Sequence, residues 1–240
     1  MKTLAIAVVG TASLVASADA GFLGFVALAK QSGGNVIVDI YTAVGNASDK
    51  FLNVYNLNAS ATGGFYQQAG LATKTWKPDA ANFNSTRSSI DSFMTAGAYS
   101  GGAYGGEYYA STNTNGDPNF TGTSWSGTPA SPAATTIPAL AGWYTGDPTS
   151  IDNSAESLAA VAGTRVDASG ASGANFGIWC AHLVVTSNTA TVSWNAFASI
   201  KDGVTGGTSQ AQSTTANFIP APGAIALLGV AAFAAHRRRD

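Results

Sequence analysis

The segment ATVSWNAFASI, residues 190–200, alternates apolar and polar side chains more clearly than any other part of the chain. Its apolar positions are Val192, Trp194, Ala196, Ala198 and Ile200, and its polar positions are Thr191, Ser193, Asn195 and Ser199. Successive side chains of a β-strand point to opposite faces of the sheet. The alternation therefore predicts a strand with one face in a hydrophobic core and the other toward water.

Other stretches predict further strands. Residues 35–44 alternate in the same way, and residues 51–57 follow after a turn built from Gly45-Asn46 and Ser48-Asp49. The short connection predicts that these two segments pair as a hairpin. Residues 175–186 are apolar on both faces, which is typical of a central, fully buried strand.

The middle of the chain has weaker patterns. Residues 88–96 fit a short helix or a strand, and the strand is slightly favoured. Residues 153–162 favour a helix, because Asp152 can cap its start and Gly163 can close its end. Residues 97–135 contain Gly-Gly and Asn-Gly-Asp-Pro turns, and predict loops around one or two strands.

Many short strands with little helix predict an all-β fold. We expect a single β-sandwich over residues 21–217, of the jelly-roll or Ig/cohesin-like kind. The likeness to the Ig-like and cohesin modules of bacterial surface proteins is one of architecture only and implies no binding site.

The composition is that of a neutral protein. Only 10% of the residues are charged, 28 of the 240 are glycine, and the formal net charge is −2. The apolar share of 45% is sufficient for a core. The low number of Lys and Arg residues argues against nucleic acid as a partner. Such a composition is typical of β-rich proteins outside the cell.

Residues 1–20 have the pattern of a secretory signal peptide. Lys2 precedes an apolar run over residues 4–15, and Ala18 and Ala20 form an A-x-A cleavage site that makes Gly21 the first mature residue. The signal helix would then be removed. The alternative is an uncleaved anchor that continues past Gly21.

Residues 218–240 have the pattern of a C-terminal hydrophobic helix. A proline motif precedes the apolar residues 223–235, and three arginines follow them. An apolar helix of this length reaches about 20 Å, which is less than the roughly 30 Å of a bilayer core. The arginines would stay on the cytoplasmic side. Such a weak span suits a temporary membrane stage better than a permanent anchor.

This tail resembles the PEP-CTERM sorting signal of bacterial proteins. The matching residues are Pro220, Ala221, Pro222, Gly229, Arg237, Arg238 and Arg239. The resemblance implies export, an exosortase-type transpeptidase as partner, and transfer to the cell envelope or to an extracellular polysaccharide matrix. Ala221 stands where the namesake motif has Glu, so the match is to the Pro-Ala-Pro variant, and the cleavage position stays open. A simple tail anchor is the alternative.

One cysteine and one histidine lie close together in the predicted exported part. Cys180 and His182 are two positions apart, so a regular strand would place them on the same face. They could form a nucleophilic pair or two metal ligands, but a structural zinc needs about four such groups. We expect a buried thiol and a core or sheet-face imidazole, with no metal site and no cofactor. A single cysteine also means that no disulfide joins two parts of this chain.

A glycan hydrolase is the alternative to a non-enzymatic role. Such an enzyme needs two carboxyl groups that face each other across a cleft. The candidates are Asp91, Glu107, Asp147 and Asp152, and none of them lies in a recognisable motif. We therefore expect no catalytic residues.

Aromatic residues are the more promising ligands for sugar. Trp76, Trp125, Trp143 and Tyr144 lie in stretches with loop-like composition, where exposed rings could contact a polysaccharide. The alternative is that these rings cap the hydrophobic core. The sequence thus predicts an exported, non-enzymatic surface or matrix protein that is either structural or polysaccharide-binding.

Overall fold

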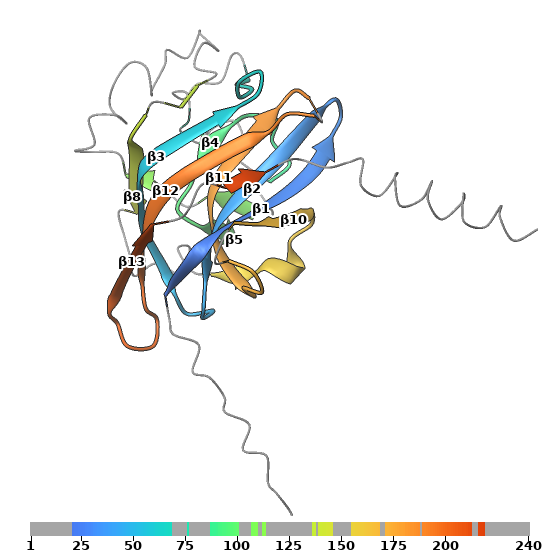
Figure 1. The fold of residues 1–240 in the computed structure, drawn as a ribbon. Coiled ribbons are helices and arrows are strands. Elements are labelled where there is room, and N and C mark those ends of the chain that lie inside the picture. Colours follow the sequence, from blue (N-terminus) through green and yellow to red (C-terminus); the bar gives the residue numbers. More distant parts are fainter. Residues whose placement is uncertain are drawn as a thin grey trace, which may run out of the picture.

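A computed structural model describes most of the chain between residues 21 and 218 (Figure 1). The described residues are 21–68, 76, 87–100, 107–109, 112–113, 136–137, 139–145, 155–168, 171–187, 189–212 and 216–218. Within them the chain forms antiparallel sheets, and the only helical element is a 3-10 turn over Leu158–Ala160. The prediction of an all-β fold is confirmed.

Sheet A is built from six strands in the order β10-β1-β2-β11-β4, and β9 also pairs with β11. The strands are β1 (Phe22–Ser32), β2 (Asn35–Val44), β4 (Phe93–Met94), β9 (Glu156–Ser157), β10 (Thr164–Asp167) and β11 (Phe176–Val185). The predicted strands at residues 35–44 and 175–186 are confirmed. The latter is buried and lies inside the sheet, as its apolar sequence indicates.

Sheet B also has six strands, in the order β13-β12-β3-β8-β7, and β14 pairs with β12. The strands are β3 (Lys50–Ala61), β7 (Thr112–Asn113), β8 (Ala141–Thr145), β12 (Val192–Lys201), β13 (Thr208–Gln212) and β14 (Ala216–Phe218). A separate pair is formed by β5 (Ala98–Ser100) and β6 (Glu107–Tyr109). The alternation in residues 190–200 is confirmed, because its apolar set is buried in the core.

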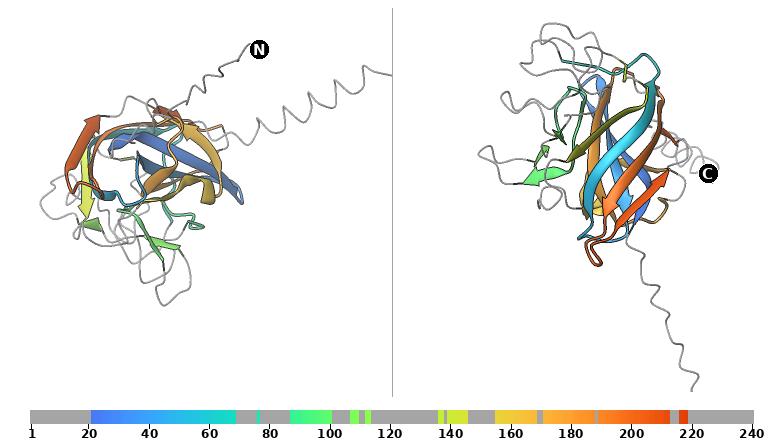
Figure 2. Two further views of the ribbon diagram at one scale, coloured as in Figure 1. Left: turned by 90° about the horizontal axis from the view of Figure 1, so that it is seen from below. Right: turned by 90° about the vertical axis from the view of Figure 1, so that its left-hand side faces the viewer.

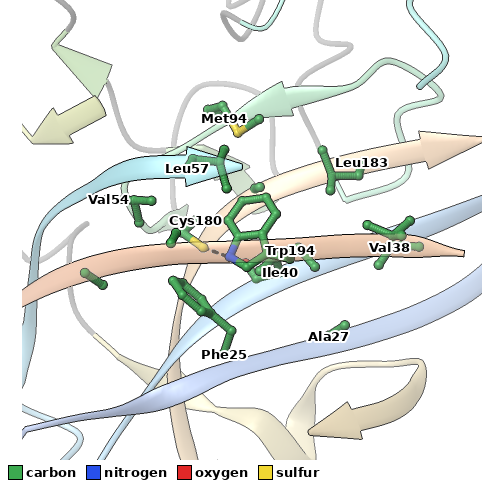
Figure 3. Packing of buried hydrophobic residues seen from close by; sticks show 14 of the residues in the cluster. Phe25, Ala27, Val38, Ile40, Val54, Leu57, Met94, Cys180, Leu183 and Trp194 are labelled. Carbon is green, nitrogen blue, oxygen red and sulfur yellow. Dashed lines mark hydrogen bonds between the residues drawn. The ribbon is translucent and has the colours of Figure 1, made fainter. Parts of the chain in front are cut away.

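The inner faces of the two sheets share one hydrophobic core, which gives the chain a β-sandwich-like arrangement (Figure 3). Trp194 of β12 lies at its centre, with ring centroids 5.6 Å from Phe25 of β1 and 6.3 Å from Trp143 of β8, both in edge-on contact. Val38 and Ile40 of β2 lie in the same cluster. These large rings therefore join strands of both sheets.

The predicted hairpin of residues 35–44 with residues 51–57 is wrong. Both segments are strands, but β2 pairs with β1 and β11 in sheet A, whereas β3 pairs with β12 and β8 in sheet B. Residues 45–49 carry the chain from one sheet to the other, so the apolar faces of the two strands both point into the core. Alternation identifies which face is buried but not which strand lies alongside.

The hairpin partner of β2 is β1, which was not among the strands predicted from the sequence. The two strands pair over almost their whole length, and Gly33 and Gly34 connect them. Gly33 has a φ angle of 61°, a left-handed conformation that glycine adopts without the steric penalty of other residues. The apolar residues after position 21 therefore belong to a strand within sheet A.

The helix predicted at residues 153–162 is also wrong for the described residues 155–162. Glu156 and Ser157 pair with β11 instead, and the backbone N–H of Leu158 donates to the carbonyl of Asn175 at 2.9 Å. The Leu158 side chain is buried against the outer face of sheet A. Pairing with a neighbouring strand and burial of this leucine have outweighed the local helical preference. Of residues 88–96, only Phe93–Met94 form a strand, as the slight preference indicated.

Two turns lock together at one end of the sheets. Asp49 accepts a hydrogen bond from the backbone N–H of Asn46 and another from that of Gly203, each at 3.1 Å. Gly203 belongs to the turn between β12 and β13, and it lies so close to the Ser48 backbone that no Cβ atom fits between them. The crossing from sheet A to sheet B is thereby fixed in place.

Among the described residues, no helix is long and apolar enough to span a membrane. The predicted signal helix, residues 1–20, and all of the predicted sorting motif, including Pro220, Gly229 and Arg237, lie outside the described residues. These features therefore stay predictions.

The contact between Gly203 and the turn at residues 45–49 can be tested by substitution. Gly203→Ala should lower the free energy of unfolding by about 2 kcal/mol, because the added methyl group overlaps the Ser48 carbonyl. Guanidinium titration of the purified full-length chain, followed by tryptophan fluorescence, measures this change. Gly34→Ala is the matched control, because a methyl group added there would have no atom within 4 Å. Equal stability changes in the two variants would show that the contact between Gly203 and Ser48 does not stabilise the fold.

Candidate functional site

Side chains that could carry function collect on the outer faces of both sheets. The outer face of sheet A holds a buried polar group of residues that we call the Asp39 cluster: Lys30, Asp39, Arg87, Trp179 and His182. The outer face of sheet B carries half-buried aromatic, amide and hydroxyl side chains. The two faces differ in whether a ligand can reach them.

Asp39 of β2 is the centre of its cluster and is completely buried. Its Oδ1 atom lies 2.6 Å from Nδ1 of His182 and accepts a hydrogen bond from the indole N–H of Trp179 at 3.1 Å. The ammonium group of Lys30 lies 3.3 Å from the other carboxylate oxygen. A buried carboxylate needs such partners, since an uncompensated charge in the interior is strongly unfavourable.

Both ring nitrogens of His182 face hydrogen-bond acceptors. Nδ1 faces the Asp39 carboxylate, and Nε2 lies 2.9 Å from the backbone carbonyl oxygen of Ser89. In a Ser-His-Asp triad the second nitrogen would face a nucleophilic hydroxyl instead. Here a carbonyl occupies that position, so the pair binds the segment around Ser89 to the sheet and has no nucleophile to activate.

Arg87 closes the cluster from outside. Its guanidinium group lies 4.5 Å from the centre of the Trp179 ring and 5.6 Å from that of Tyr41, which are distances for cation–π contact. It also hydrogen-bonds to the Tyr41 hydroxyl and forms an ion pair with Glu156. The Phe93 ring stacks on His182 with centroids 4.8 Å apart. The outer face of sheet A is therefore covered by the chain's own segments.

The surroundings of Asp39 affect its ionisation. Burial by itself raises the pKa of the Asp39 carboxyl, but the charge and hydrogen bond of His182 and the charges of Lys30 and Arg87 bring the pKa below its ordinary value. Asp39 is therefore ionised at neutral pH and stabilises the fold through its partners.

Cys180 lies apart from His182, which corrects the expectation that they share a face. The register of β11 with β2 shifts between Trp179 and Ala181, so Cys180 is the extra residue of a β-bulge. Cys180 points into the core with Ala181, whereas His182 points to the Asp39 cluster. Burial raises the pKa of the Cys180 thiol well above its ordinary value, which leaves it inert as a nucleophile.

The thiol is buried, as expected, and donates to the carbonyl of Ile40 at 3.3 Å. His182 is also buried, and it lies on the outer face of sheet A, as expected for a sheet-face imidazole. In the described part of the chain, no group of three His, Cys, Asp or Glu side chains could hold a metal ion.

Two of the four aromatic residues considered as possible sugar contacts are buried, so the alternative of a core position holds for them. Trp76 and Trp143 are each only 1% exposed. Trp143 belongs to β8 and donates its indole N–H to the carbonyl of Thr95 at 2.8 Å. Large rings stabilise the fold most in the core, because they bury the most apolar area there. Trp125 lies outside the described residues, and Tyr144 is half-buried on the outer face of sheet B.

The outer face of sheet B is visible in the right-hand view of Figure 2, where β8, β3, β12 and β13 lie side by side. Tyr55 of β3 and Phe197 of β12 are opposite each other in the register, and their rings stack with centroids 5.2 Å apart. The next row places Asn53 between Tyr144 of β8 and Ser199 of β12. We call these five residues the sheet-B patch.

The sequence contains a signal for this patch, although it is weaker than the alternation itself. Phe197 is an aromatic residue in the otherwise polar half of the alternation in residues 190–200. Tyr55 is likewise on the polar face of its strand, two positions from Asn53. A large apolar ring on a water-facing position is informative, but only the pairing of β3 with β12 shows that these two rings meet.

Two polar atoms of the patch are buried without hydrogen-bond partners. They are the Oγ atom of Ser199 and the Oδ1 atom of Asn53, and Ser199 as a whole is only 1% exposed. Such atoms destabilise a fold by about 1–3 kcal/mol each, so most proteins avoid them. The two atoms belong to one cross-strand pair beside aromatic rings. At this position the described residues leave the hydrogen-bonding capacity of both atoms unused.

Of the four carboxylates considered for the hydrolase alternative, only Asp91 has a described side chain. It is buried, and its Oδ1 atom accepts a hydrogen bond from the backbone N–H of Gln68 at 2.7 Å. The side chains of Glu107, Asp147 and Asp152 lie outside the described part of the structure. Asp91 is thus engaged in holding the backbone.

Comparison with known proteins adds no relative to this picture: no family model, curated protein or solved structure matches the chain. Function must therefore be inferred from the two outer faces. The Asp39 cluster is closed by its own chain, whereas the sheet-B patch is partly open to solvent.

The role of the Asp39 cluster can be tested through pH. Asp39→Asn should lower the free energy of unfolding by about 3 kcal/mol near pH 7, because the cations Lys30 and Arg87 and the hydrogen-bonded His182 ring lose their anionic partner. The folded-state pKa of Asp39 lies below the ordinary value of 3.8, so its stabilising effect is complete above that value. It is lost as the pH falls through the folded-state pKa, where wild type and variant should converge.

Urea titrations of both proteins at neutral and strongly acidic pH measure this difference. Asp167→Asn is the matched control, since Asp167 forms a half-exposed ion pair with Arg165 at 2.5 Å, a type of pair that contributes about 1 kcal/mol or less. A stability difference for Asp39→Asn that stays constant down to low pH would refute the assigned role.

Proposed function

We propose that this chain is an exported, non-enzymatic surface or matrix protein that an exosortase-type system sorts, and that its role is structural or polysaccharide-binding. The observation that carries the proposal is the sheet-B patch, where paired aromatic rings lie beside amide and hydroxyl side chains. Neutral proteins bind sugars by apolar contact with aromatic rings of the protein and by hydrogen bonds to the hydroxyl groups of the sugar. The patch offers both on one sheet.

The absence of an assembled catalytic group among the described residues supports a binding or structural role. His182 has a backbone carbonyl where a nucleophile would lie, Cys180 is buried, and Asp91 bonds to backbone. A glycan hydrolase would use a pair of facing carboxyl groups. No observation on the described residues favours that alternative.

The ends of the described structure are compatible with the proposed processing. Cleavage before Gly21 would leave all of β1 in the mature chain. The last described strand, β14, ends at Phe218, two positions before the proline motif. Phe22 pairs with Val44 at one end of the sheets, whereas Phe218 pairs with Val192 at the opposite end. The sorting tail would then leave the domain at the end remote from the mature N-terminus.

We also propose that residues 21–217 form a single β-sandwich domain, with the jelly-roll and the Ig/cohesin-like descriptions both open. The shared core of sheets A and B supports one domain, because its residues come from both ends of the chain. The chain has a single cysteine, so no internal disulfide can form. The packing of this core therefore holds the domain together.

The sorting proposal predicts a change in processing when the basic cluster is removed. Replacing Arg237, Arg238 and Arg239 by alanine should prevent recognition of the tail. Immunoblots of fractionated producing cells should show the variant at full tail-bearing size in the membrane fraction, and the wild type shortened and outside it. A conservative control replaces the three arginines by lysines, which keeps the positive charge. Identical distribution of wild type and alanine variant would exclude exosortase-type sorting.

The polysaccharide proposal predicts retention on the producing organism's own matrix. The purified full-length chain should stay bound to matrix polysaccharide in a pull-down at both low and high salt, since contacts by uncharged groups are weakly screened. The unbound fraction is also tested for shortened glycan. Shortened glycan would replace the proposal with the hydrolase alternative, and no retention would leave a purely structural role.

A further inference from the structure

We infer that the sheet-B patch is a subsite for one sugar unit of a neutral polysaccharide, with Tyr55 and Phe197 in contact with the sugar ring and Asn53 and Ser199 on its hydroxyl groups. This inference rests on the proposed polysaccharide binding and specifies its place and its ligand class.

The charge distribution favours a neutral ligand. The described strands of sheet B carry no Asp or Glu, and their only cations, Lys50 and Lys201, are opposite each other at one end. The patch itself is uncharged. Aromatic ring faces carry partial negative charge, so they attract sugar C–H groups and repel carboxylates. An acidic glycan would therefore find poor partners at the centre of the patch.

The spacing of the two rows suits one sugar unit. Asn53 and Tyr55 are two positions apart on β3, as are Phe197 and Ser199 on β12, and all four side chains lie on the face opposite the core residues Val54 and Ala198. Two positions along a strand span about 7 Å. A pyranose ring that contacts Tyr55 and Phe197 can therefore reach the neighbouring pair, Asn53 and Ser199, with its hydroxyl groups.

The unsatisfied atoms indicate what that next row binds. The Ser199 hydroxyl can donate and accept, and the Asn53 Oδ1 atom accepts. Among the described residues neither atom has a hydrogen-bond partner, and both atoms are buried. A sugar hydroxyl both donates and accepts, so it complements this pair once the covering side chain moves aside. Tyr144, half-buried next to Asn53, closes the row on the β8 side.

This arrangement predicts opposite effects of one substitution on stability and on binding. Ser199→Ala removes a buried hydroxyl that has no partner, so the variant should unfold at a higher denaturant concentration than wild type. The same variant should bind the glycan about fivefold more weakly, because one hydrogen bond to the ligand is lost. A merely structural serine would not weaken glycan binding.

The experiment is affinity electrophoresis of the purified full-length chain in gels that contain the neutral or the acidic fraction of the matrix polysaccharide, separated by anion exchange. Wild type should be retarded by the neutral fraction, with little effect of salt. Tyr55→Ala and Phe197→Ala should weaken binding by about tenfold or more. Thr164→Ala, at an exposed position of β10 in sheet A, is the control and should behave as wild type.

The outcomes separate this inference from the proposal beneath it. Retention of wild type on the neutral fraction, with equal retention of all patch variants, would place the binding site elsewhere and overturn the inference alone. Retention only on the acidic fraction, released by salt, would overturn the neutral ligand class. No retention on either fraction would refute polysaccharide binding itself.

Far-ultraviolet circular dichroism checks that Tyr55→Ala and Phe197→Ala remain folded. If neither folds, the Ser199→Ala variant decides the matter, because its predicted gain in stability ensures a folded protein.

Discussion

Two pairs of consecutive strands cross the core shared by the two sheets, and the rest of the fold depends on this constraint. β2 and β3 are consecutive in sequence, as are β11 and β12, yet β2 pairs with β11 in sheet A and β3 pairs with β12 in sheet B. The chain crosses between the sheets at residues 45–49 at one end and at residues 186–191 at the other. Each end is thus closed by a covalent connection, which is valuable in a domain without an internal disulfide.

The outer faces of the two sheets differ in their exposure to solvent. The central strands of sheet A are buried on both sides, and the segments around Arg87, Leu158 and Ala171 cover its outer face. The outer face of sheet B carries mainly polar and half-buried side chains, so it tolerates water. This asymmetry leaves sheet B as the side that is able to present side chains to a ligand.

The bulge at Cys180 shows how one extra residue changes the chemistry of a strand. In a regular strand, Cys180 and His182 would share a face, and His182 would lie in the apolar core without partners. The bulge shifts the alternation by one, so Cys180 and Ala181 both fill the core and His182 reaches Asp39. Bulges often re-aim side chains in this way. Here the result is a buried ionic contact that fixes the cover of sheet A.

The sequence by itself determined the all-β class, the strands at residues 35–44, 175–186 and 190–200, and the burial of the Cys180 thiol. Period-two alternation is a local property, so it survives without knowledge of neighbours. The tertiary structure alone decided that β2 and β3 lie in different sheets, and that Trp76 and Trp143 are core residues. It also decided that Tyr55 meets Phe197. These facts depend on which distant segments pair, and no local pattern encodes the partner of a strand.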